Sequence, residues 1–210
     1  MTFVKICGIT SIEDALLALD AGADALGLNF VPASKRLVDR VTAAHIADAV
    51  GDALELIAVV ADRSTDDLEA LRDATGIRWL QLHGSEAPEA LNWLLPEAFK
   101  AVAIGGAADA QRAATYAGTR LLVDAKSADG QLGGTGQRFD WSLVAPLARA
   151  RDLIVAGGLR PDNVAEAVRA LRPFGVDVAS GVEVAGNPRQ KDAAKLHAFI
   201  AAVRESEQVA

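Results

Sequence analysis

Short apolar runs alternate with amphipathic helical patterns along the whole length of this 210-residue chain. Apolar residues follow one another within each run, which is typical of parallel strands covered by helices on their outer face. The runs predict eight strands, at residues 3–6, 25–30, 54–60, 78–82, 100–104, 120–123, 153–156 and 176–179.

A helical pattern follows each predicted strand. It is clearest after the first one, where Ile12, Leu16 and Leu19 recur at the spacing of one helix face. The hydroxyl of Thr10 or Ser11 is suited to cap that helix. Further helices are predicted near 42–50 and 65–74, from Pro88, over 107–116, over 140–145 where Pro146 ends it, from Pro161, and around 196–203.

Eight regular strand–helix units indicate a closed sheet. The fold class predicted here is α/β, a single-domain (β/α)8 TIM barrel that spans residues 1–210. Barrels of this type usually have about 250 residues, with about 200 at the small end. An open, doubly wound sheet is the alternative, but eight short-looped units fit closure better. Neither a linker nor a second domain is apparent in the sequence.

Composition and charge narrow the classes of function. Apolar residues make up 51% of the chain, enough for a sizeable core, and its one cysteine excludes an internal disulfide. We therefore expect a reducing, cytoplasmic compartment. The N-terminus lacks a signal-peptide pattern, and no apolar run has the ~18 residues that suggest a membrane span. A net charge of −7 without a basic block argues against a nucleic-acid partner.

Polar side chains stand where several predicted strands end. Cys7, Arg36, His83 and Asp124 follow the first, second, fourth and sixth runs, so we expect them at one mouth of the barrel. Each also has a plainer interpretation: a buried structural thiol, a solvated loop charge, a hydrogen-bonded ring, or a paired carboxylate. Asp177, within the eighth run, is interpreted as a core residue bonded to backbone amides.

The loops after the seventh and eighth strands predict a phosphate site. Gly157 and Gly158 leave the seventh strand, and Ser180 and Gly181 leave the eighth, before a short extra helix predicted over 182–185. Such barrels often bind phosphate there, on backbone N–H groups and a helix N-terminus. No metal-binding motif is present among the dispersed histidines.

The glycine-rich stretch 130–137 predicts a lid over the bound ligand, with a slack surface loop as the alternative. Its central residues are Gly133, Gly134, Thr135 and Gly136.

Taken together, these motifs resemble the phosphoribosylanthranilate isomerase family of tryptophan biosynthesis. The resemblance runs from Lys5 to about Glu183. It is carried by KICGIT (5–10), PASKR ending at Arg36, QLHG (81–84), LLVDAK (121–126), GGTGQRFDW (133–141), AGGL (156–159) and DVASGVE (177–183).

The resemblance implies a TIM barrel that performs an Amadori rearrangement on a small phosphosugar–anthranilate substrate without a cofactor or metal. It implies that Asp124 is the general acid, that Cys7 is the base, and that Arg36 holds the anthranilate carboxylate with His83 near the same ring. Such an acid needs a raised pKa and such a base a lowered one. The residues alone leave acid and base interchangeable. We expect a monomer or weak homodimer.

Three other functions remain to be weighed. Indole-glycerol-phosphate synthase would need a lysine acid at a strand end, whereas Lys5 lies deeper in its strand than Cys7. A ribulose-phosphate epimerase would need a metal cluster. A non-catalytic sensor of phosphate ligands would keep the glycine loops without needing both Cys7 and Asp124.

Overall fold

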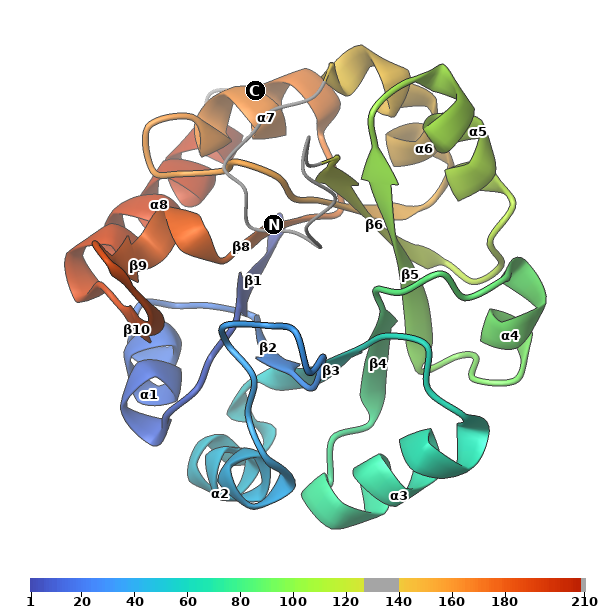
Figure 1. Cartoon of the computed structure of the whole chain (residues 1–210). Coiled ribbons are helices and arrows are strands. Elements are labelled where there is room, and N and C mark those ends of the chain that lie inside the picture. Colours follow the sequence, from blue (N-terminus) through green and yellow to red (C-terminus); the bar gives the residue numbers. More distant parts are fainter. Residues whose placement is uncertain (127–139, 209–210) are drawn as a thin grey trace.

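Eight parallel strands close into a barrel in chain order, with helices around the outside (Figure 1). The computed structural model describes residues 1–126 and 140–208. The prediction of a single (β/α)8 barrel is confirmed. The barrel strands are β1 (Phe3–Cys7), β2 (Ala25–Asn29), β3 (Glu55–Val60), β4 (Trp79–Leu82), β5 (Ala98–Ile104), β6 (Arg120–Ala125), β7 (Asp152–Val155) and β8 (Gly175–Val178).

The helices pack against the outer face of this barrel. They are α1 (Ile12–Asp20), α2 (Arg40–Val50), α3 (Thr65–Thr75), α4 (Pro88–Asn92), α5 (Ala107–Ala114), α6 (Ala145–Ala150), α7 (Val164–Leu171) and α8 (Ala193–Gln208). Ser11 caps α1, because its hydroxyl accepts the Asp14 N–H, while the Thr10 hydroxyl donates to the Arg189 carbonyl instead. Within the described ranges, no helix combines the length and apolarity that crossing a bilayer requires.

Two local predictions are wrong. Residues 140–145 do not form one helix: a 3-10 turn, η2 (Trp141–Leu143), precedes α6, whose first turn contains Pro146. Proline lacks only an N–H that the first turn leaves unbonded, so it begins this helix rather than ending it.

The extra helix predicted over 182–185 is also wrong. A 3-10 turn, η3 (Ser180–Val182), leads into β9 (Glu183–Val184), which pairs antiparallel with β10 (Asn187–Lys191). Gly186 makes the connection between them with a φ of +77°, a conformation open mainly to glycine.

An aromatic plug fills the N-terminal end of the barrel interior. The Arg120 guanidinium lies 4.1 Å from the ring centre of Trp79 and 5.7 Å from that of Phe99, and it pairs with Glu55. Phe3 and Phe174 stack beside it at 5.3 Å. Cation–π contacts of this kind are strongest where water is excluded. The plug leaves the C-terminal ends of the strands as the open end of the barrel.

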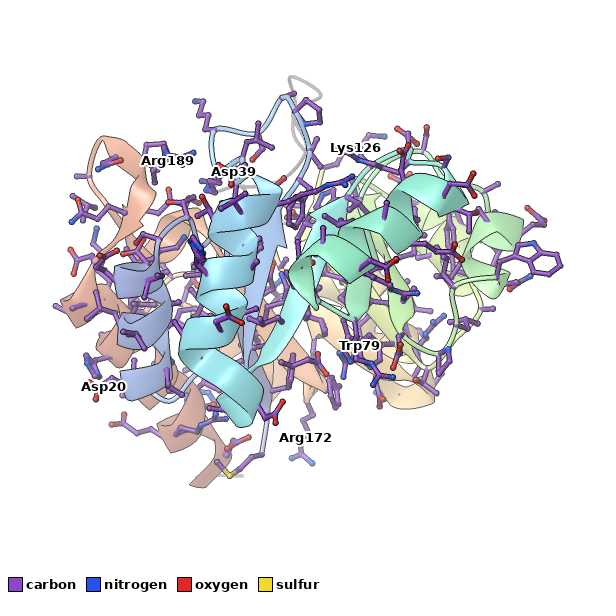
Figure 2. The ribbon with its side chains drawn as sticks, turned by 90° about the horizontal axis from the view of Figure 1, so that it is seen from below. Asp20, Asp39, Trp79, Lys126, Arg172 and Arg189 are labelled. Carbon is purple, nitrogen blue, oxygen red and sulfur yellow. The ribbon has the colours of Figure 1, made fainter. Side chains whose placement is uncertain are left out.

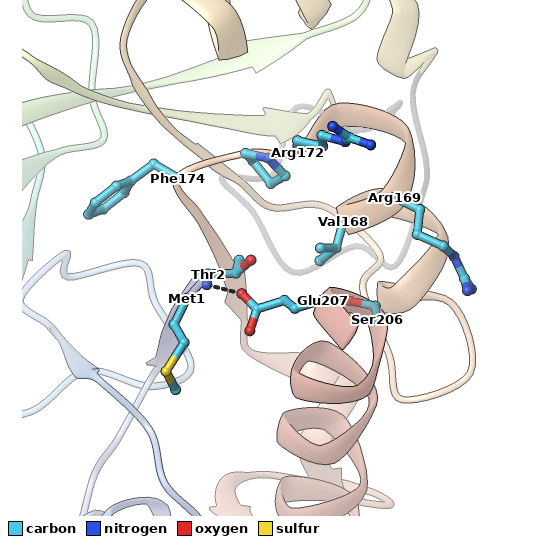
Figure 3. Close-up of a pocket in the computed structure, with 9 residues that line it drawn as sticks. Met1, Thr2, Val168, Arg169, Arg172, Phe174, Ser206 and Glu207 are labelled. Atoms are coloured by element: carbon cyan, nitrogen blue, oxygen red, sulfur yellow. Dashed lines mark hydrogen bonds between the residues drawn. The ribbon is translucent and has the colours of Figure 1, made fainter. Parts of the chain in front are cut away.

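The two ends of the barrel therefore differ in character (Figure 2). Lys126 and Arg189 lie toward one end, and Trp79 and Arg172 toward the other. The N-terminal end also holds a cavity of about 580 Å³, where the Glu207 carboxylate accepts the Thr2 N–H (Figure 3). This cavity lies away from the strand ends that carry the polar residues.

Candidate active site

Cys7 and Asp124 are carried into the mouth by the ends of two strands. Cys7 is the last residue of β1, and Asp124 the last but one of β6. Along β1, Phe3 belongs to the interior plug, so Lys5 and Cys7, at two-residue steps, also face the interior. The sequence prediction that strand ends bring these groups to one mouth agrees with this placement.

Asp124 is buried, with 7% of its surface exposed. Burial and the neighbouring carboxylate of Asp177 raise the pKa of Asp124 to about 7, although the Ala125 N–H and the Lys5 ammonium oppose the rise. A carboxyl with this pKa is about half protonated at neutral pH, so it is able to give or take a proton. The raised value is the one that an acid in this position needs.

Cys7 is a free thiol that is half-buried in the mouth. Burial raises the pKa of Cys7, and Asp177 adds to the rise, whereas Lys5 and Lys191 oppose it. The pKa of Cys7 is therefore raised, where the base role implied by the resemblance needs a lowered one. Burial thus favours the thiol form of Cys7, whereas the two cations favour the thiolate.

Asp177 lies inside the barrel, where it accepts a hydrogen bond from the Lys5 ammonium at 2.8 Å. Asp177 is thus a core residue as predicted, but among the described residues its partner is the Lys5 ammonium and not a backbone amide. Burial alone would lower the pKa of Lys5, but Asp177 and Cys7 hold it above its ordinary value. A lysine held as an ammonium is a poor Schiff-base nucleophile.

Arg36 comes from the loop after β2 and is engaged on one edge by Glu183. Its Nε donates to Glu183 Oε1 at 2.6 Å and its Nη2 donates to Oε2 at 3.1 Å. Lys191 supports the same carboxylate from β10 at 3.3 Å. The arrangement is a planar two-point pair, so the guanidinium is held in one orientation over the mouth.

His83 follows β4 and contacts Gln81, whose amide nitrogen lies 2.9 Å from His83 Nδ1. Burial, with the positive charges of Lys100 and Lys5, lowers the pKa of His83 to about 4. The ring is therefore neutral at pH 7. With the Gln81 amide donating, Nδ1 accepts and Nε2 carries the proton, so His83 offers a hydrogen bond rather than a charge.

The glycines after β7 and β8 lie where a side chain has no room. A Cβ on Gly157, whose φ is +91°, would lie 2.5 Å from the Ala125 nitrogen, and one on Gly181 would lie 2.0 Å from the Leu159 oxygen. Gly158 also has a positive φ, of 62°. In the described part of the chain, no hydrogen bond occupies the N–H of Gly157 or Gly158. These groups are thus available to an anion.

Comparison with known proteins decides between the enzyme families that share this barrel. A family model described as N-(5'phosphoribosyl)anthranilate (PRA) isomerase matches residues 4–202. The chain belongs to the phosphoribosylanthranilate isomerase family. The N-(5'-phosphoribosyl)anthranilate isomerase of Myxococcus xanthus is 47% identical over 206 residues, covering 96% of this chain and 95% of that protein.

Solved phosphoribosylanthranilate isomerases have the same fold. The Thermotoga maritima structure matches with a TM-score of 0.88 and 33% identity, covering 98% of this chain and 100% of that one. The Thermus thermophilus structure matches with a TM-score of 0.85 and 38% identity, over 97% and 99% of the two chains. A further match, with a TM-score of 0.85 and 32% identity over 98% and 100%, is a complex with reduced 1-(o-carboxyphenylamino)-1-deoxyribulose 5-phosphate.

The prediction of an isomerase of tryptophan biosynthesis on a TIM barrel is confirmed by this membership. The comparisons do not test the roles of individual residues, which stay predictions. The predicted lid residues Gly133, Gly134, Thr135 and Gly136 lie outside the described residues. Over residues 1–126 and 140–208, no group of three His, Cys, Asp or Glu side chains is arranged to hold a metal ion.

Sequence reasoning missed three charged residues of this isomerase's mouth. Glu183 stands in the DVASGVE motif with no role assigned to it, Lys191 belongs to none of the motifs, and Lys5 lies deeper in its strand than Cys7. The two-residue step from Lys5 to Cys7 was the available signal, since it puts both side chains on one face of the strand.

We expect Gly157→Ala to abolish competition between inorganic phosphate and substrate, because its Cβ would press on the Ala125 nitrogen and on Asp124 Oδ1, 2.9 Å away. Inhibition constants for phosphate in the wild type and the variant measure this. Gly186→Ala is the matched control, since Gly186 also has a positive φ but nothing lies within 4 Å of its Cβ position. Competition that persists in Gly157→Ala would place the anion elsewhere.

Proposed function

We propose that this chain converts N-(5′-phosphoribosyl)anthranilate into 1-(2-carboxyphenylamino)-1-deoxyribulose 5-phosphate, with Asp124 as the general acid and Cys7 as the general base. The observation that carries these roles is the pair of proton-transfer groups that β1 and β6 bring to one barrel mouth. The pKa of about 7 at Asp124 suits it to the acid role.

The reaction needs two proton transfers at different atoms. Asp124 protonates the furanose ring oxygen, and the ring opens to a Schiff base between the sugar and the anthranilate nitrogen. Cys7 then removes the proton on C2′, giving an enolamine that tautomerises to the ketone. The sum is an isomerisation, because no atom or electron enters from outside. Two groups on separate strands suit this order, since each approaches the sugar from its own side.

The phosphate and the carboxylate of the substrate anchor its two ends. The N–H groups of Gly157, Gly158 and Gly181, with Ser180, receive the phosphate after β7 and β8. Arg36 receives the anthranilate carboxylate on the edge of its guanidinium that Glu183 leaves open. The neutral His83 ring donates a hydrogen bond beside the same aromatic ring.

We expect Arg36→Ala to raise KM by tenfold or more while kcat falls much less, because a clamp on the carboxylate acts in the ground state and the transition state alike. Steady-state kinetics with phosphoribosylanthranilate separate the two constants. Arg78→Ala is the control, because Arg78 is an exposed arginine that precedes β4 at the opposite end of the barrel. An unchanged KM in Arg36→Ala would leave Arg36 as a surface charge held by Glu183.

The activity itself is tested by adding the purified chain to freshly made phosphoribosylanthranilate and following the loss of its fluorescence. We expect rapid loss with the wild type and a slow background with the Cys7→Ala/Asp124→Asn double variant. Binding without any fluorescence loss in the wild type would favour the phosphate-ligand sensor instead.

A monomer or weak homodimer is the assembly proposed for this chain, and the cytoplasm its compartment. One matching structure is described as monomers generated from a dimeric Thermotoga maritima isomerase, which supports a chain that folds as a monomer and can form a dimer. The single cysteine suits a reducing compartment. Light scattering over a range of protein concentrations measures the assembly, and a stable dimer at the lowest concentration would contradict the proposal.

A further inference from the structure

A buried ion pair lies beneath the two proposed proton-transfer groups. Lys5 and Asp177 are register partners on β1 and β8, and their charged atoms are 2.8 Å apart. The Lys5 side chain has no exposed surface, and Asp177 is buried too. A buried pair costs desolvation energy that its own attraction barely offsets, so it is weak evidence for stability. A gain in stability therefore does not account for this ion pair.

The Lys5 ammonium and the Cys7 thiol border the same small space inside the barrel. Cys7 pairs in register with Gly27 on β2, and a Cβ on Gly27 would lie 2.8 Å from Lys5 Nζ and 2.9 Å from Cys7 Sγ. Both atoms thus border the small space that the missing side chain leaves. The positive charge of Lys5 therefore acts on the Cys7 thiol as well as pairing with Asp177.

The other buried lysines of the barrel are used differently. Lys100 donates to the carbonyl oxygens of Leu82, Gly84 and Ala101. Lys191 donates to the Cys7 carbonyl at 2.8 Å as well as to Glu183. These contacts tie main-chain segments together, although each of the two lysines also pairs with a carboxylate, Glu86 for Lys100 and Glu183 for Lys191. Among the described residues, the Lys5 ammonium donates to the Asp177 carboxylate and to no main-chain carbonyl, and the titratable Cys7 thiol borders the same space.

The carboxylate of the pair acts on the opposite side of the mouth. Asp177 is, after burial itself, the main influence that keeps a proton on Asp124, and Lys5 opposes it there. The same pair therefore has one pole toward the proposed base and one toward the proposed acid. When the surroundings of two titratable groups push their pKa values apart, one group is suited to act as the acid and the other as the base.

We propose that Lys5 and Asp177 are a positioning pair for the reaction, in which the Lys5 ammonium favours the thiolate of Cys7 and the Asp177 carboxylate favours the protonated form of Asp124. The role of the pair in the reaction rests on the proposed function. Its effect on the charge state of Cys7 is testable without substrate. The other charges that face Cys7 are Lys191 on β10 and Arg36 on the loop after β2.

Alkylation of Cys7 by iodoacetamide across pH measures the thiolate directly, because the chain has one cysteine. Lys5→Met is expected to slow alkylation at pH 8 by about tenfold, which corresponds to one unit in the pKa of Cys7. Asp177→Asn is expected to speed it by a similar factor, since the ammonium then has the thiolate as its only anionic partner. The double variant should lie between the two.

Opposite signs are the decisive result, because a merely loosened structure would shift both single variants in the same direction. Shifts in the same direction, or no shift in either variant, overturn the proposal. Should Lys5→Met fail to fold, slower alkylation of the double variant than of Asp177→Asn gives the same answer. Lys126→Met, at an exposed lysine after β6, controls for the general positive field of the mouth.

The failure of this pair is distinguishable from the failure of the proposed function. If alkylation shows the opposite signs, the pair sets the state of Cys7 whether or not turnover depends on that thiol. If the fluorescence assay confirms turnover but the pH midpoints of alkylation coincide in the wild type and the variants, the proposed function stands and the pair is only structural. Lys5→Arg should restore the alkylation rate toward the wild type, since it returns the positive charge.

Discussion

Replacing Cys7 by alanine is expected to lower kcat by about 10²–10⁴-fold, the usual cost of losing a general base. The thiol is the proposed acceptor of the C2′ proton, and neither Lys5 on the same strand nor its β2 partner replaces it, because Lys5 is held as an ammonium and the partner is Gly27. The substitution removes one atom from a half-buried site, so the fold should persist. Stopped-flow fluorescence and circular dichroism measure the two effects.

The reaction step at which the Cys7→Ala variant stops also tests the assignment of the base. Cys7→Ala should still open the furanose ring but leave the C2′ proton in place, so substrate deuterated at C2′ should show a primary isotope effect only where abstraction limits the rate. A bound product analogue should also protect the wild-type thiol from alkylation. A Cys7→Ala variant with near wild-type kcat would make this thiol a structural one and would end its assignment as the base.

Sequence patterns predicted the frame of the site because barrel geometry is repetitive. A strand that runs into a loop delivers its last side chains to one end of the barrel, so Cys7 and Asp124 were identifiable from strand endings alone. The glycines at 157 and 181 were identifiable for the same reason, although their close contacts with Ala125 and Leu159 appear only in three dimensions.

The charge network could not be predicted in the same way. Lys5 and Asp177 are 172 residues apart in the chain, and Arg36 and Glu183 are 147 apart. Nothing local distinguishes such a partner from a solvated charge. The raised pKa of Cys7 has the same origin, because burial depends on every strand around the thiol and outweighs the cations beside it.

The errors in local structure have a different cause. From the sequence, Pro146 is predicted to end a helix, although proline is favoured in the first turn of a helix, where the structure has it. The extra helix over 182–185 was inferred by analogy with other phosphate-binding barrels. Here β9 and β10 instead form a hairpin, and it delivers Glu183 and Lys191 to the mouth. The hairpin thus supplies the charges that orient Arg36.

Replacing Asp124 by asparagine is expected to lower kcat/KM by about 10²–10⁴-fold below pH 7, and by progressively less above it. With a pKa of about 7, the wild-type acid loses its proton as pH rises further. Cys7, whose pKa is raised, gains thiolate over the same range. The two changes offset each other in the wild type and leave a plateau. The asparagine variant keeps only the rise, so its deficit should shrink by about tenfold per pH unit.

Kinetics of both proteins from pH 5 to pH 9 measure this ratio. A deficit in kcat/KM that stays constant between pH 5 and pH 9 would mean that the change of the wild-type pH profile near pH 7 is caused by a group other than Asp124. The reference variant is Asp109→Asn, because Asp109 is a carboxylate on α5 near the same end of the barrel whose pKa is lowered rather than raised, by the Gly105 N–H above all. Its profile should follow that of the wild type.

Stability should respond in the opposite sense to activity. The unfolded chain ionises Asp124 near pH 4 and the folded chain near pH 7, so between these values the folded state binds more protons. Stability therefore falls as pH rises from 4 to 7, by at most about 4 kcal/mol for the three-unit difference. The Asp124→Asn variant does not lose this stability, because asparagine does not ionise. Urea titrations should find Asp124→Asn more stable than the wild type at pH 8, with the advantage vanishing near pH 4. An equal difference at both pH values would mean that burial of this carboxylate carries no such cost.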